Sequence, residues 1–181
     1  MSAPLTQEGS GLVSRGLRVI LAAMALWYLV AYVGMAYFRI RYPFDLELLE
    51  GYTVDVIARV LSGQKIYVSP SLEFISPIYS PLYYYFSGLL AKMVGLGFLA
   101  PRLVSFLSAA GSFFLIYLIV KKETKSFFAG FLSSGLMAAT FDLGNGWYDL
   151  ARVDSLFLFF LLVAIYLLRF HATASGWFTA A

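Results

Sequence analysis

The sequence predicts an all-α polytopic membrane protein with about four transmembrane helices and an extracytoplasmic loop that carries juxtamembrane amphipathic helices. Three observations predict this fold class. The 181 residues are 61% hydrophobic and only 13% charged, whereas a soluble domain is about half apolar and about a quarter charged. The mean hydropathy is +0.80. Uncharged apolar runs recur along the chain, and the charged residues gather between them, which indicates contact with a lipid bilayer.

The composition also excludes several kinds of site and partner. The chain has no cysteine and a single histidine, His171, so it offers neither a disulfide, a thiol nucleophile nor a His-cluster metal site. We therefore expect no metal and no cofactor. The net charge of +3 is small and the lysines and arginines are scattered, which indicates that nucleic acid is not a partner.

The first transmembrane helix is predicted at about residues 19–38, after a small polar stretch, residues 1–14, that we predict to be a disordered tail. The run is uncharged and long enough to cross a core of ~30 Å at ~1.5 Å per residue. A signal peptide has a shorter apolar core that ends at small residues, whereas this run ends at Tyr37-Phe38. Arg15 and Arg18 favour a cytoplasmic N-terminus, and we expect the bacterial inner or plasma membrane.

An outer loop, residues 39–101, follows and begins with the most charged region of the chain. Apolar positions at spacings of three and four within residues 44–67 predict an amphipathic helix. Its predicted capping and pairing residues are the N-cap Asp45, the ion pair Asp55–Arg59 and the stop Gly63. Residues 68–81 hold three prolines and predict extended or turn structure. Leu82–Val94 is apolar but short for a span, so it lies in the outer interface or re-enters.

Three more spans are predicted at about residues 102–120, 126–141 and 152–168. The last of them can borrow apolar residues from 150–153. The clusters Lys121–Lys125 and Arg169/His171 belong on the cytoplasmic side, which allows one crossing between the first span and Lys121. The transmembrane module then covers residues 15–171, and residues 172–181 are a tail or a truncation point.

Two acidic stretches, residues 45–55 and 142–154, fall on the same outer face in this arrangement. Glu50 is the first catalytic candidate, because a carboxylate at a membrane face can act as a general base or orient a substrate hydroxyl. Glu47 shares its helix face and would raise its pKa. The alternative for both is a solvated helix face.

Asp154 is the second catalytic candidate, because it lies at the edge of a short span beside Arg152. The alternative is that an ion pair of Arg152 with Asp154 or Asp149 anchors the helix end. Asp149 can equally be a helix N-cap. Tyr83, in the Pro/Tyr segment 76–85, is a candidate for stacking on a sugar or lining a lipid-chain groove, with an ordinary aromatic belt as the alternative.

Three groups of residues together resemble a known enzyme family. They are Glu50-Gly51-Tyr52 with Ile57–Gln64, then Tyr79–Tyr85, then Ala151–Ser155. In this order and spacing they resemble the N-terminal part of a polyprenol-dependent GT-C glycosyltransferase, similar to the family 39 (dolichyl-phosphate-mannose–protein mannosyltransferase-like) membrane enzymes. The resemblance covers roughly residues 18–170.

The resemblance implies transfer of a sugar from a polyprenyl-phosphate donor to an unidentified acceptor outside the cytoplasm. Glu50 and Asp154 match the family's two acidic positions, with Glu50 as the base or orienting carboxylate, and Arg152 or Arg59 would meet the donor phosphate. The chain has Glu50-Gly51 where the family usually has Asp-Glu. Family members run to several hundred residues, so we expect an N-terminal portion that is too short to act alone.

Two other function classes stay open at this point. In a non-catalytic membrane subunit or scaffold, the acidic loops would only anchor helix ends. A small transporter component should carry ionisable residues near the middle of its spans. The middles of the four predicted spans are uncharged, which counts against a transporter.

Overall fold

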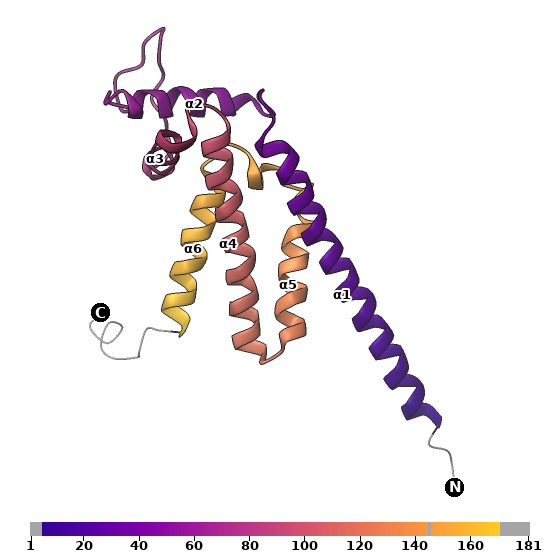
Figure 1. The fold of residues 1–181 in the computed structure, drawn as a ribbon. Helices are drawn as coiled ribbons and strands as arrows, with labels where there is room; N and C mark the ends of the chain where they lie inside the picture. Colours follow the sequence, from indigo (N-terminus) through magenta and orange to yellow (C-terminus); the bar gives the residue numbers. More distant parts are fainter. Residues whose placement is uncertain (1–4, 145, 171–181) are drawn as a thin grey trace, which may run out of the picture.

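The computed structural model describes residues 5–144 and 146–170, and every regular element within them is a helix (Figure 1). In chain order the elements are α1 (Leu5–Ile40), α2 (Leu48–Leu61), α3 (Leu82–Val94), α4 (Leu99–Thr124), α5 (Phe127–Ala139), the short 3-10 helix η1 (Trp147–Asp149) and α6 (Asp154–Phe170). The predicted all-α class is confirmed. Residues Val13–Ile40 of α1 and the whole of α4 are long and apolar enough to cross a membrane, and α5 is a shorter apolar helix. It remains a prediction that α5 and α6 also cross the membrane.

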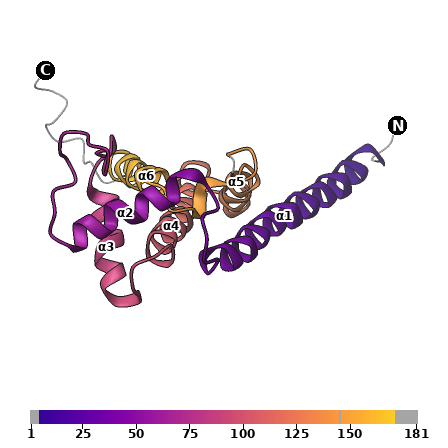
Figure 2. The same ribbon diagram turned by 90° about the horizontal axis from the view of Figure 1, so that it is seen from above.

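Helix α4 is the centre of the bundle, because it packs against α3, α5 and α6. Helix α1 leans against α5, while α2 and α3 lie across one end of the bundle (Figures 1 and 2). We call this the capped end. The start of α1, the α4–α5 turn and the last turn of α6 lie at the opposite end. The cationic cluster Lys121–Lys125 and Arg169 are therefore far from both acidic stretches, as the charge pattern predicts.

Helix α2 has the apolar face that the spacing predicts. Val56 and Ile57 are completely buried and belong to one core cluster with Tyr83 and Tyr84 of α3. The predicted stop at Gly63 is also confirmed. Its φ of +69° lies in the left-handed region that glycine tolerates, and the amides of residues 63 and 64 bond back to the carbonyls of residues 60 and 59, which is a Schellman motif.

Several predicted boundaries differ from the structure. Residues 5–14, predicted as a disordered tail, continue α1, since no proline follows Pro4 to interrupt the helix. The N-cap of α2 is Glu47 and not Asp45, because the Glu47 Oε2 accepts the Leu49 amide at 2.9 Å. Helix α6 begins at Asp154 and borrows nothing from residues 150–153, which lie outside any helix.

The predicted ion pair between Asp55 and Arg59 is absent from the described residues. Arg59 instead donates to the Lys65 carbonyl at 3.2 Å and lies over the Phe74 ring, 4.0 Å from its centroid. The Phe74 ring and the Lys65 carbonyl give the Arg59 guanidinium two partners at once. An exposed ion pair one helical turn apart contributes only about 0.3–0.5 kcal/mol to stability. His171 and residues 172–181 lie outside the described residues.

Gly135→Ala tests the close approach of α1 and α5. A Cβ at Gly135 would clash with Ala25 of α1, and small residues at such contacts let transmembrane helices pack closely. We expect the substitution to lower the free energy of unfolding by about 1–3 kcal/mol, the usual cost of overpacking. Thermal unfolding of the detergent-purified protein measures it.

Gly34→Ala is the matched control, because a Cβ there meets nothing within 4 Å and alanine favours helix more than glycine does. Equal melting temperatures for the two variants would contradict the close α1–α5 contact.

Candidate active site

A fully buried ion pair joins α2 to α4 at the capped end. The Arg102 Nε donates to Glu50 Oε1 at 2.8 Å and its Nη2 donates to Oε2 at 2.6 Å, and both side chains have zero exposed area. This is the bidentate arrangement that an arginine fork makes with a carboxylate. Glu50 also accepts the amide of Leu46 at 2.7 Å and that of Ala151 at 2.8 Å. The carboxylate therefore connects the first acidic stretch directly to the second.

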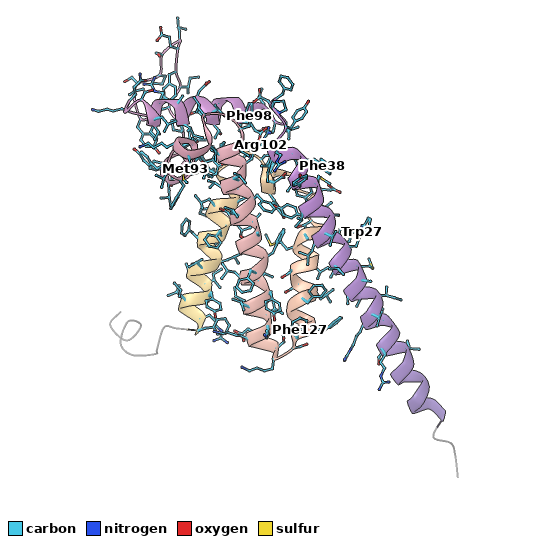
Figure 3. The ribbon with its side chains drawn as sticks, in the orientation of Figure 1. Trp27, Phe38, Met93, Phe98, Arg102 and Phe127 are labelled. Carbon is cyan, nitrogen blue, oxygen red and sulfur yellow. The ribbon has the colours of Figure 1, made fainter. Side chains whose placement is uncertain are left out.

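The remaining donors of Arg102 hold the chain that leads from α1 to α2. Its Nη1 donates to the carbonyls of Arg39 at 2.9 Å and Tyr42 at 2.6 Å, and its Nη2 donates to that of Phe44 at 2.7 Å. Figure 3 places Arg102 in the first turns of α4, where these segments meet. All five N–H groups of the guanidinium are thus used.

The environment of Glu50 keeps its carboxylate ionised. Burial alone would raise its pKa, but the hydrogen bonds from Arg102 and from the two backbone amides outweigh burial, and the pKa lies below its ordinary value. We predicted that Glu47 would raise this pKa. That prediction is wrong, because Glu47 turns toward Arg152 instead. Glu50 offers no exposed oxygen to a substrate in this structure.

A second buried carboxylate, Asp149, pairs with Arg39 at the end of α1. The Arg39 Nη1 donates to Asp149 Oδ1 and to the Gly146 carbonyl, each at 2.9 Å. Asp149 has zero exposed side-chain area, and its Oδ2 has no partner within the described residues. Burial raises the pKa of Asp149 to about 6, and the positive charge of Arg39 opposes that rise. Of the roles considered for Asp149, neither a helix N-cap nor a pair with Arg152 is formed.

Unlike Glu50 and Asp149, Asp154 is accessible. It is the first residue of α6, its side chain is 49% exposed, and its Oδ2 accepts from the Arg152 Nε at 2.9 Å. Arg152 also lies 3.3 Å from Glu47 Oε1 and stacks over the Trp147 ring, 4.0 Å from the centroid. Two carboxylates and an indole thus hold the guanidinium beside Asp154.

Asp154 lies on the wall of a mostly apolar cavity of about 370 Å³. The cavity is lined by Tyr79, Ser80, Leu82, Tyr83, Val153, Asp154, Leu156, Phe157 and Phe160. Asp154 and Tyr79 also line a much smaller pocket that reaches α2. Cavities of roughly 300–1,000 Å³ with few polar groups are the usual form of a ligand site. No cluster of three or more carboxylate or histidine side chains within residues 5–144 and 146–170 could hold a metal ion.

Comparison with known proteins gives one match. A family model described as dolichyl-phosphate-mannose-protein mannosyltransferase matches residues 77–181, more than half of the chain. The chain belongs to this family. The family implies a membrane glycosyltransferase, and together with the two long apolar helices it makes this an integral membrane protein. A search of curated proteins and a search of solved structures find no match.

The matched region contains Asp154, Arg152, Tyr83 and Arg102, whereas Glu47 and Glu50 precede it. The buried ion pair therefore joins the part of the chain that matches the mannosyltransferase family to the part before it. The Glu47–Arg152 ion pair and the Glu50–Ala151 hydrogen bond link the same two parts.

Four of the six predicted site residues lie together: Glu47, Glu50, Arg152 and Asp154. The two acidic stretches thus lie on one side of the bundle, as predicted, and that this side is extracytoplasmic stays a prediction. Tyr83 is buried, its hydroxyl donates to the Pro101 carbonyl at 2.8 Å, and it lines the Asp154 cavity. Arg59 contacts Lys65 and Phe74 and makes no contact with Asp154.

Sequence reasoning missed Arg102, which has more hydrogen bonds here than any of the predicted residues. One signal was present. Arg102 is the only charged residue between Lys92 and Lys121, and it lies at the end of an apolar run. An ionisable residue at membrane depth needs a named partner, and that requirement could have pointed to one of the carboxylates in the two acidic stretches.

Glu50→Gln tests the buried pair, because it removes one charge and keeps the shape of the side chain. A buried Arg102 without a counter-charge should lower the free energy of unfolding by about 3–5 kcal/mol. Thermal unfolding in detergent measures this loss. Asp154→Asn is the control, since that carboxylate is half exposed, and we expect its melting temperature to equal the parent's. Equal stability of both variants would contradict a stabilising ion pair.

The pKa of Asp149 predicts how stability changes in mildly acidic solution. Its folded value of about 6 lies above the ordinary value of 3.8, so between the two the folded state binds more protons than the unfolded state. The free energy of unfolding contributed by Asp149 then falls as the pH rises through this window. We expect Asp149→Asn to remove that decline in thermal scans at a series of pH values, and parallel pH profiles would contradict it.

Proposed function

We propose that this chain transfers a sugar from a polyprenyl-phosphate donor to an acceptor hydroxyl, and that Asp154 is the carboxylate that receives the acceptor proton. The supporting observation is the position of Asp154. It is half exposed, it lies on the wall of an apolar cavity, and one of its oxygens is held by a guanidinium. The family supports the reaction type.

The step needs one base and one cation. The acceptor oxygen forms a bond to the anomeric carbon while the bond from that carbon to the phosphate oxygen breaks, and the phosphate leaves with the electron pair. The proton of the acceptor hydroxyl passes to Asp154, whose Oδ1 accepts no hydrogen bond among the described residues. Arg152 is the nearest cation for the leaving phosphate, and a guanidinium suits that role. The apolar wall that includes Phe157 and Phe160 suits the isoprenoid part of the donor.

Glu47 and Glu50 are positioning residues in this proposal. Glu47 holds Arg152, and Glu50 holds the amide of Ala151, the residue directly before Arg152. Their loss should reduce activity by displacing Asp154. Glu50 is not the proposed base, because all its hydrogen-bonding positions are filled within the protein.

The extracytoplasmic face is the proposed side for the reaction. Lys121, Lys122, Lys125 and Arg169 lie at the end of the bundle away from Asp154 (Figure 1). Cationic loops favour the cytoplasm, so this distribution supports a cytoplasmic N-terminus and an active site on the outer face.

Asp154→Asn should abolish sugar transfer in membranes that carry the full-length protein, at least a hundredfold by loss of a general base, while leaving its thermal stability unchanged. Release of radiolabelled sugar from a polyprenyl-phosphate donor measures the reaction. Asp142→Asn is the matched control, since Asp142 is an exposed carboxylate in the same outer segment. Full activity of Asp154→Asn would contradict the assignment, and inactivity of the parent would favour a non-catalytic subunit.

A further inference from the structure

A second, larger cavity lies between α1 and the loop that connects α3 to α4. It measures about 840 Å³ and is lined by Val33, Tyr37, Ile40, Arg41, Tyr42, Pro43, Val94, Gly95, Leu96, Gly97, Phe98, Leu99, Leu103 and Phe106. It shares no lining residue with the Asp154 cavity. The mechanism proposed above makes no use of it.

Part of the cavity wall comes from the two helices that are long and apolar enough to cross a membrane. Val33 belongs to α1, and Leu103 and Phe106 belong to α4. Since α1 packs mainly on α5, α1 and α4 diverge below the capped end (Figures 1 and 2). The cavity is therefore bordered by apolar residues of both helices.

One charged residue lines the cavity, and it is a cation. Arg41 is exposed, its guanidinium lies 4.9 Å from the centroid of the Tyr37 ring, and its Nη1 donates to the Tyr37 hydroxyl at 3.4 Å. No carboxylate lies within ion-pair distance of Arg41 in the described part of the chain. The first turn of α4, which has no side-chain cap, adds the positive end of its dipole at the same place.

We propose that this cavity binds one bilayer phospholipid, with its phosphodiester against Arg41 and an acyl chain along Val33, Leu103 and Phe106. The Arg41 guanidinium, which has no carboxylate partner among the described residues, is complementary in charge to the lipid phosphodiester. The apolar side chains of the wall suit a hydrocarbon chain. The occupant differs from the sugar donor, since a donor phosphate must reach Asp154 and this cavity does not include it.

The proposed lipid would also stabilise the capped end. Arg41 lies between Arg39 and Tyr42, whose carbonyls accept hydrogen bonds from the buried Arg102. A lipid that holds Arg41 therefore restrains the segment to which the buried ion pair is attached. Removal of lipid should lower the melting temperature of the parent protein.

The test is native mass spectrometry of the full-length protein in mild detergent, titrated with a phosphatidylglycerol. We expect one bound phospholipid per chain, and an apparent affinity about tenfold weaker in Arg41→Gln, the loss expected from one charged hydrogen bond. Lys65→Gln is the matched control, because Lys65 is an exposed cation outside the cavity, and its affinity should equal the parent's. Val33→Trp fills the apolar part and keeps Arg41, and it should bind at least tenfold more weakly.

Three outcomes would overturn the proposal. If Arg41→Gln binds the lipid as tightly as the parent, the proposed contact between Arg41 and the phosphodiester is wrong. If Val33→Trp binds as tightly as the parent, no acyl chain occupies the cavity, and the lipid contacts the protein only through its headgroup at an exposed cation. A polyprenyl phosphate could be the lipid that co-purifies at this site, and its loss from Arg41→Gln would then assign the cavity to the donor.

Discussion

The buried pair of Arg102 and Glu50 is the interaction on which the capped end depends. Removal of two charges from water costs several kcal/mol per ion, and the pair is tolerable only when its other hydrogen-bonding positions are also filled. Here Arg102 donates five hydrogen bonds and Glu50 accepts four. A lysine could replace the charge but not the fork geometry. The pair thus determines where three separate segments of the chain meet.

Under the proposed mechanism, this constraint gives the two carboxylates of the candidate site different roles. Glu50 is completely engaged and acts through the backbone, because the amide it accepts belongs to Ala151, which directly precedes Arg152. Asp154 has one oxygen held by Arg152, its side chain is half exposed, and it lines the cavity. Loss of Glu50 should therefore affect folding and activity together, whereas loss of Asp154 should affect activity alone.

The sequence predicted the parts of this arrangement that depend on periodicity and charge. The apolar face of α2 and its stop at Gly63 follow from spacing, and the two acidic stretches are placed on one side by the distribution of the cationic clusters. The partner of Glu50 could not be predicted from the sequence, because Arg102 lies 52 residues away and any of several carboxylates could have paired with this arginine. The N-cap at Glu47 was missed because glutamate is not among the preferred caps. Its other carboxylate oxygen pairs with Arg152, a contact that the sequence did not predict.

The segment between α1 and α2 connects all these features. The carbonyl of Arg39 accepts from Arg102, while the side chain of Arg39 holds the buried Asp149 just before Asp154. Arg41, two residues on, lines the cavity proposed for a phospholipid. A displacement of α1 relative to α4 would therefore strain both buried carboxylates at once. Since Asp149 lies on the segment that leads into Asp154 and Glu50 holds the Ala151 amide of that segment, the geometry of the candidate base depends on how α1 is held, and the proposed lipid beside α1 would be part of the environment of the candidate site.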